Sequence, residues 1–91
     1  MVVYRRYFKS HIVALNWNPP VPVTGITVIS YNVYRSTTRG GPYVKIASSL
    51  HGPRYSDSLV NHGRTYFYVV TSVDKRGRES RYSGEVRAEI P

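Results

Sequence analysis

Short runs rich in Val, Ile, Tyr and Thr alternate with clusters of Gly, Pro and Asn along the whole chain. Residues of the first kind favour strands, and residues of the second kind end them. Val86, Ala88 and Ile90, for example, alternate with polar residues, which places the apolar side chains on one face of a strand. The runs predict strands within residues 11–17, 26–36, 43–48, 65–74 and 85–90, with shorter or doubtful ones at 55–60 and 1–8. The pattern predicts an all-β sandwich.

The length of the chain fits a single domain that spans residues 1–91. A domain of this size can bury one compact core. The sequence contains no cysteine, so neither a disulfide nor thiol chemistry is available to it. The redox compartment therefore stays open.

The charge balance is strongly basic, with 13 Lys and Arg against 5 Asp and Glu and a net charge of +8. Such a balance favours contact with acidic polysaccharide, nucleic acid or an acidic protein. The basic residues run from Arg5 to Arg87 without a dense block, which also fits a charge that only keeps the domain soluble. An anionic polysaccharide is therefore a candidate partner, and nucleic acid is a less favoured one.

No stretch approaches the roughly 20 apolar residues of a membrane helix, so we expect no membrane insertion. The first 17 residues carry early positive charge, but Lys9, Ser10 and His11 interrupt any apolar core. This segment does not have the pattern of a signal peptide. If the parent protein is exported, we expect its signal outside this chain.

Four segments, "VALNW", "SYNVYRSTTRGGPYVKIAS", "RYSDSLVNHGRTYFYVVTSVDKRGRES" and "YSGEV", together resemble a fibronectin type III domain. The resemblance covers residues 11–90 and is to the kind found in tandem on bacterial exported proteins. It implies an all-β fold, an immunoglobulin-like antiparallel β-sandwich of about seven strands. Tyr66, six residues after Val60, matches the tyrosine corner of the family, where the phenol hydroxyl bonds to the backbone of the preceding loop.

The implied fold also assigns directions to side chains. It turns inward Trp17, Tyr31, Val33, Tyr66, Tyr68, Val70 and Ser72, and outward Asn32, Tyr34, Phe67, Val69, Thr71 and Val73. Asp57 and Asp74 match positions beside turns, where a carboxylate accepts backbone N–H groups. The first strand departs from the family because Arg5 and Arg6 interrupt it. It is expected to be stunted, frayed or supplied by another molecule, which would allow weak self-association of an otherwise monomeric domain.

Catalytic patterns are missing from the sequence. It has no G-x-S-x-G motif, no His spacing typical of a metal site, and no carboxylate pair that can be placed around a cleft. We therefore expect no enzyme activity, no metal and no cofactor. The resemblance places His51 and His62 on loops at opposite ends.

Two surfaces are candidates for partner binding. The loops at 18–25, 49–54 and 74–80 cluster at one end of this fold and gather the cations His51, Arg54, Lys75, Arg76 and Arg78. The alternative is that residues 74–80 form only a charged turn, with Gly77 at positive φ and Glu79 offsetting its basic neighbours. The second surface is the outward sheet face with Tyr34, Phe67 and Val69, whose exposed aromatic rings would stack on sugars or proteins.

The expected function is that of a non-catalytic spacer and protein-interaction module in a larger exported or cell-surface protein, with a protein partner that the sequence does not identify. One alternative is an accessory domain of a secreted polysaccharide-degrading enzyme. The other is a weak binding module for an anionic polymer.

Overall fold

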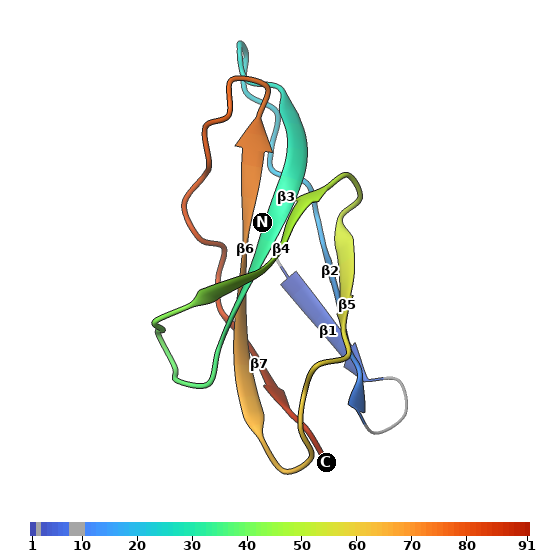
Figure 1. Cartoon of the computed structure of the whole chain (residues 1–91). Helices are drawn as coiled ribbons and strands as arrows, with labels where there is room; N and C mark the ends of the chain where they lie inside the picture. The colour runs from blue at the N-terminus through green and yellow to red at the C-terminus, as the bar shows by residue number, and fades with distance from the viewer. Residues whose placement is uncertain (2, 8–10) are drawn as a thin grey trace.

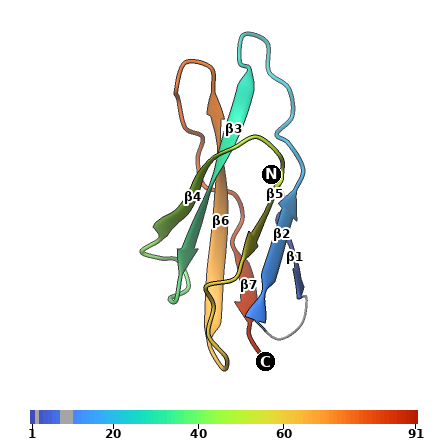
Figure 2. The same ribbon diagram turned by 45° about the vertical axis from the view of Figure 1, so that its right-hand side comes forward.

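The computed structural model of the chain describes residues 1, 3–7 and 11–91. Over these residues it has seven strands in two antiparallel sheets that face each other (Figures 1 and 2). One sheet has the order β1 (Val3–Tyr7), β2 (Val13–Trp17), β5 (Arg54–Asp57). The other has the order β4 (Val44–Leu50), β3 (Val28–Ser36), β6 (Thr65–Asp74), β7 (Val86–Glu89). The expected all-β, immunoglobulin-like sandwich is confirmed.

The core lies between the two sheets. Tyr66, Tyr68 and Val70 alternate along β6 and are buried against residues of the opposite sheet. Trp17 is 3% exposed, and its ring meets the ring of Tyr31 edge-on at a centroid distance of 5.4 Å. The predicted central position of Trp17 is therefore confirmed.

Residue Tyr66 forms the expected tyrosine corner. Its hydroxyl oxygen accepts the backbone N–H of Asn61 at 2.9 Å, while its ring is buried in the core. The bond fixes the loop between β5 and β6 to the start of β6.

A buried carboxylate joins the two sheets, which the sequence did not predict. Asp57 of β5 is 2% exposed. Its Oδ2 accepts hydrogen bonds from Arg35 Nη1 at 2.8 Å and from the Tyr68 hydroxyl at 2.7 Å. Both donors belong to the other sheet. Burial and the hydrogen bond to Asp57 raise the pKa of Tyr68 far above its ordinary value. The predicted turn contact also exists, because Asp57 Oδ1 accepts the N–H of Leu59 at 3.1 Å.

The first strand pairs with its own chain. Residues from Val3 to Tyr7 align antiparallel with β2, and Val3 is 6% exposed within the core. The strand is the edge of its sheet. The side chains of Arg5 and Arg6, on which the doubt about this strand rested, lie outside the described residues. Fraying and self-association through β1 remain predictions.

Candidate functional site

Three loops lie at one end of the sandwich, which we call the pole (residues 18–27, 50–54 and 74–80). The β2–β3 loop and the β6–β7 turn stand side by side at this end (Figures 1 and 2). The Lys75 N–H bonds the Thr27 carbonyl at 2.9 Å and links these two loops. The β4–β5 loop is held nearby, since His51 Nδ1 lies 3.3 Å from the Ile29 carbonyl oxygen. The β2–β3 loop and the β6–β7 turn therefore meet at this end, whereas a common site for all five cations remains a prediction.

The basic loop is a tight turn organised by Asp74. Its Oδ1 accepts the N–H groups of Arg76 and Arg78 at 3.0 and 2.9 Å, and its Oδ2 accepts Arg78 Nε at 2.8 Å. The backbone N–H bond from Arg78 is the largest cause that lowers the pKa of Asp74. Gly77 has φ +80°, a conformation that glycine adopts without strain. The turn role predicted for Asp74 and Gly77 is confirmed.

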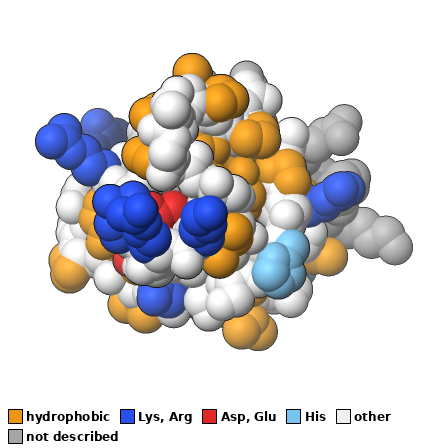
Figure 3. Space-filling view, turned by 90° about the horizontal axis from the view of Figure 1, so that it is seen from above, with side chains coloured by type: hydrophobic (Ala, Val, Ile, Leu, Met, Phe, Trp, Pro, Cys, Tyr) orange, Lys and Arg blue, Asp and Glu red, His pale blue; other side chains and the backbone are white. Residues whose placement is uncertain are grey.

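The predicted cations of the pole are exposed: His51, Arg54, Lys75, Arg76 and Arg78. Seen from above, basic side chains surround a small acidic patch (Figure 3). Arg78 pairs with Asp74, whereas Lys75 and Arg76 pair with no carboxylate in the part of the chain that the structure describes. The net positive potential of the turn therefore comes mainly from Lys75 and Arg76.

Sequence reasoning missed an apolar patch beside these cations. It consists of Val21 (84% exposed), Val23 (57%) and Ile26 (46%), which line one hollow together with Pro19, Pro20 and Pro22. Hydrophobic side chains gather next to the basic ones at this end (Figure 3). Because contiguous exposed aliphatic side chains commonly mark a binding surface, the patch adds an apolar component to the pole. The signal was present as Val21 and Val23, which flank Pro22 in a stretch that the sequence predicts only as a loop.

The prediction of an exposed aromatic face is wrong. Tyr34, Phe67 and Val69 are only 9%, 8% and 2% exposed. The chain after the basic turn runs along β6 and covers this face, with N–H bonds from Ser80 to the Ser72 carbonyl and from Ser83 to the Val70 carbonyl. The rings of Tyr34 and Phe67 therefore offer no open stacking surface.

The role expected of Glu79 is also wrong, because its carboxylate faces the sheet and not the cations of the turn. Its Oε2 accepts hydrogen bonds from Thr71 Oγ1 at 2.6 Å, from Asn32 Nδ2 at 3.1 Å and from the Tyr34 hydroxyl. The hydrogen bonds from Thr71 and Tyr34 lower the pKa of Glu79 below its ordinary value. Asp74, and not Glu79, offsets the basic turn.

A comparison with a solved structure decides the family. The chain is 34% identical to an Fn3-like protein from Clostridium thermocellum, whose structure it matches with a TM-score of 0.83 over 99% of this chain and 88% of that one. It also matches a domain of the twitchin kinase region from C. elegans at 21% identity and a TM-score of 0.84, which supports the fold alone. The chain belongs to the fibronectin type III family. No family model matches it.

Curated relatives of this fibronectin type III domain are much longer proteins. The domain is 52% identical over 60 residues to an amylopullulanase of Thermoanaerobacter thermohydrosulfuricus, covering 66% of this chain and 4% of that protein. It is 41% identical over 71 residues to an amylopullulanase of Thermoanaerobacterium saccharolyticum, in a match that covers 78% of this chain and 5% of that protein. The domain thus spans only about a twentieth of these relatives.

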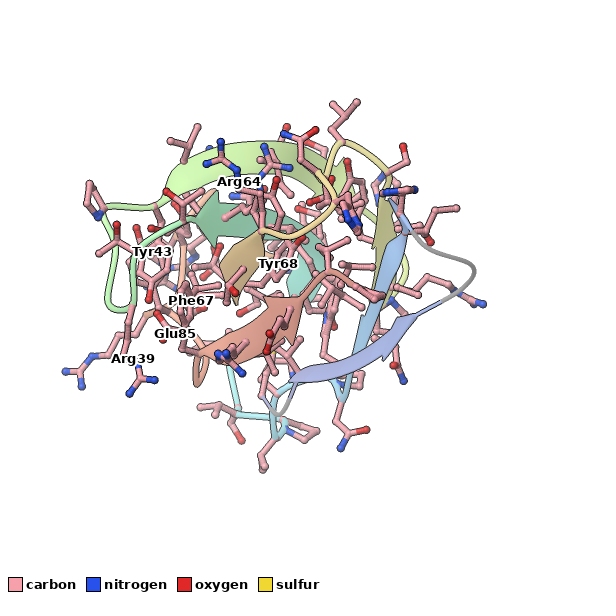
Figure 4. The ribbon with its side chains drawn as sticks, turned by 90° about the horizontal axis from the view of Figure 1, so that it is seen from below. Arg39, Tyr43, Arg64, Phe67, Tyr68 and Glu85 are labelled. Atoms are coloured by element: carbon pink, nitrogen blue, oxygen red, sulfur yellow. The ribbon has the colours of Figure 1, made fainter. Side chains whose placement is uncertain are left out.

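The far end of the fibronectin type III domain holds a second polar cluster. It centres on Tyr43 and Glu85, which are both labelled in Figure 4. Glu85 accepts the Gly40 N–H at 2.8 Å and the Tyr43 hydroxyl, and burial together with the latter bond raises the pKa of Tyr43 to about 12. These contacts fasten the β3–β4 loop to the segment before β7.

Metal and membrane sites were also sought. Within residues 1, 3–7 and 11–91, no three His, Asp or Glu side chains are grouped as a metal site requires. None of the described residues forms a helix that is both long and apolar enough to span a bilayer.

Proposed function

We propose that this fibronectin type III domain is a non-catalytic accessory module of a larger, exported polysaccharide-degrading enzyme. The observation that carries the proposal is the 52% identity over 60 residues to an amylopullulanase of which the domain covers 4%. A β-1,2-glucanase from Parabacteroides distasonis is 31% identical with a TM-score of 0.70, and the match covers 11% of that chain. It too is an enzyme of which the matched domain is a small part. In both cases most of the relative lies outside the matched domain.

The engagement of the carboxylates supports a non-catalytic role. Each of the 5 acidic side chains already has a structural partner in the domain. Asp57 joins the sheets, Asp74 organises a turn, Glu79 and Glu85 hold the segment before β7, and Glu89 pairs with Arg87. Acid–base hydrolysis of glycosides needs two carboxyl groups facing each other across the scissile bond, and these contacts leave none so placed.

The pole supports a role in spacing and contacting a neighbouring protein domain. Its aliphatic patch, rimmed by Lys75 and Arg76, complements an apolar surface with an acidic edge. A neighbouring domain of the same polypeptide is the proposed occupant, because the relatives carry most of their length outside the matched segment.

The accessory role is tested by reading the open reading frame that encodes this segment and by assaying the domain alone. We expect a polysaccharide-degrading catalytic domain in the same frame. The isolated domain should release no reducing sugar from pullulan. A frame without such a domain, or hydrolysis by the isolated domain, would contradict the proposal.

The contact at the pole is tested in the whole polypeptide with Val21→Asp. We expect faster amide hydrogen exchange over residues 18–27 in the variant polypeptide, while the isolated domain keeps its melting temperature. Leu59→Asp is the matched control, because Leu59 is 79% exposed and belongs to the β5–β6 loop. Equal exchange in the wild-type and Val21→Asp polypeptides would argue against docking at the pole.

A further inference from the structure

A shallow groove lies on the outer face of the four-stranded sheet, where the chain after the basic turn crosses it. We call it the tyrosine groove; it is lined by Tyr34, Thr71, Glu79, Ser80, Arg81 and Tyr82. The lining comes from β3, β6 and the segment before β7. The groove adjoins the pole and shares Glu79 and Ser80 with it, but it lies along the sheet and not on the end of the sandwich.

The segment that forms one wall is pinned at two serines. Ser80 and Ser83 donate their N–H groups to the carbonyls of Ser72 and Val70 at 2.8 and 2.9 Å. Their hydroxyl oxygens accept the N–H groups of Ser72 and Val70 at 2.9 and 2.8 Å, in place of backbone carbonyls.

Two residues, Arg81 and Tyr82, therefore lie opposite the single residue Thr71 of β6. This segment is not a strand, but an extra residue between two bonded positions changes where the side chains there point, as a bulge does within a strand. The two serines fix the ends of this stretch, and Arg81 and Tyr82 lie between them.

The ring of Tyr82 is fixed yet exposed. It meets the ring of Tyr34 edge-on at 5.2 Å and that of Tyr43 at 5.1 Å. Tyr82 nevertheless remains 52% exposed. A half-exposed aromatic ring whose orientation is already set loses little conformational entropy when a flat apolar surface packs on it.

Polar groups beside the ring are also arranged in advance. All three described donors to Glu79 bond its Oε2, so its Oε1 receives none of them. Because these bonds lower the pKa of Glu79, the carboxylate is ionised at neutral pH and acts as a fixed acceptor. Arg81 is exposed and lines the same groove, where its guanidinium supplies donors.

We propose that the tyrosine groove binds a neutral polysaccharide chain, with a sugar ring packed on Tyr82 and sugar hydroxyls bonded by Glu79 and Arg81. A hexose has an apolar face and a rim of hydroxyls, which matches an aromatic ring flanked by an acceptor and donors. Glu79 and Arg81 carry opposite charges, so the lining of the groove has no net charge and favours a neutral sugar, although the domain as a whole is basic. The shallow, open form suits a chain lying across the surface. We expect this polysaccharide to be an α-glucan such as pullulan, a choice that rests on the proposed function because the relatives are amylopullulanases.

The experiment is a titration of the isotopically labelled domain with maltohexaose, cellohexaose and tetragalacturonate, followed by amide NMR shifts at physiological salt. We expect maltohexaose to shift the amides of residues 80–83 and Thr71. Tyr82→Ala should weaken binding by roughly tenfold, and Tyr82→Phe should bind nearly as the native domain does. Leu59→Ala is the control for loss of an exposed apolar side chain elsewhere. A native-like amide spectrum of Tyr82→Ala shows that the fold is intact.

The outcomes separate this inference from the accessory role. Preference for cellohexaose would retain the groove and replace the α-glucan with a β-glucan. Equal binding by the native domain and Tyr82→Ala would overturn the groove as a neutral-sugar site. Shifts confined to residues 18–27, 50–54 and 74–78, or stronger binding of tetragalacturonate, would do so too. Absence of binding to both neutral sugars would do the same. None of these results bears on whether the encoding frame contains a catalytic domain.

Discussion

The two faces of the β3–β6 pair are both buried, but by different means. On the inner face, Tyr68 and Val70 pack among apolar side chains of the opposite sheet. On the outer face, Asn32 and Thr71 are covered by a polar segment whose Glu79 accepts their hydrogen bonds. An antiparallel sheet in a sandwich usually leaves its outer face to solvent. The inner face is therefore closed by the hydrophobic effect, and the outer face by local hydrogen bonds and edge-to-face tyrosines.

This difference makes the outer cover separable from the core. Residues 79–85 reach the sheet mainly through a few hydrogen bonds and edge-to-face rings, whereas the inner face depends on apolar packing between the two sheets. Local structures with few buried apolar contacts open at lower free energy than the whole domain. Breaking the inner face should unfold the domain, and breaking the outer cover should only loosen one segment.

The largest effect is expected for Trp17→Ala on the inner face. Loss of this ring, which is 3% exposed, leaves a cavity against Tyr31 and should cost about 3–5 kcal/mol of unfolding free energy. That is a large share of the stability of a small domain. Thermal and urea denaturation measure it. An unchanged melting curve would show that the inner face does not depend on this residue.

The inner face and the basic turn could be predicted from the sequence. The cover of the outer face could not, for a physical reason. The positions of Trp17 and Tyr66 followed from the resemblance to the family, and the turn at Gly77 followed from the backbone conformation that it requires. The cover of the outer face did not, because "ESRYSGE" is polar and its contacts with β6 are hydrogen bonds, which leave no trace in hydropathy. The run "TYFYVVTSVD" did hold a signal, since continuous apolar character indicates a strand buried on both faces.

A smaller effect is expected for Tyr68→Phe, which keeps the ring and removes one hydroxyl. The hydroxyl donates to buried Asp57 at 2.7 Å, and hydrogen bonds to charged groups contribute about 1.5–3 kcal/mol. Arg35 still pairs with Asp57, so the carboxylate is not left alone. Urea denaturation at neutral pH measures the loss, and Tyr55→Phe on β5 serves as a tyrosine control that is only partly buried. Equal stability of the native and Tyr68→Phe domains would show that this bond between the sheets contributes nothing.

A still smaller effect is expected for Glu79→Gln on the outer face, about 1 kcal/mol because the site is partly solvated. The native pKa of Glu79 is below its ordinary value of 4.5, so the ionised form stabilises the fold. This contribution is complete above the unfolded-state pKa and is lost as the pH falls through the lower native pKa. The difference between native and variant stability should therefore shrink on acidification.

Amide exchange locates that effect. The N–H groups of Val70 and Ser72, which bond the hydroxyls of Ser83 and Ser80, should exchange faster in Glu79→Gln. The N–H groups between β2 and β5 should keep their rates. Uniform acceleration over both sheets would show that the outer cover is part of the global folding unit and would remove the distinction between the two faces.

The smallest effect on stability is expected at the pole, for the triple variant Lys75→Ser, Arg76→Ser, Arg78→Ser. Asp74 still accepts the backbone N–H groups of residues 76 and 78, so the turn should persist and the melting temperature should stay nearly unchanged. A matched control removes Arg39, Arg64 and Arg87. In each set one cation pairs with a carboxylate, Arg78 with Asp74 and Arg87 with Glu89. Arg39 and Arg64 are labelled in Figure 4, seen from the end opposite the pole.

Heparin chromatography of the two triple variants then decides whether the pole is a polyanion site or a charged turn. If the +8 charge acts as a diffuse field, both variants should elute at equally reduced salt, since each loses the same charge. We expect this result, because Asp74 lies within the cluster and offsets part of it. If the cations of the pole act together, only the first variant should lose retention. The native salt dependence would then have a log–log slope of roughly −3, one counterion for each cation.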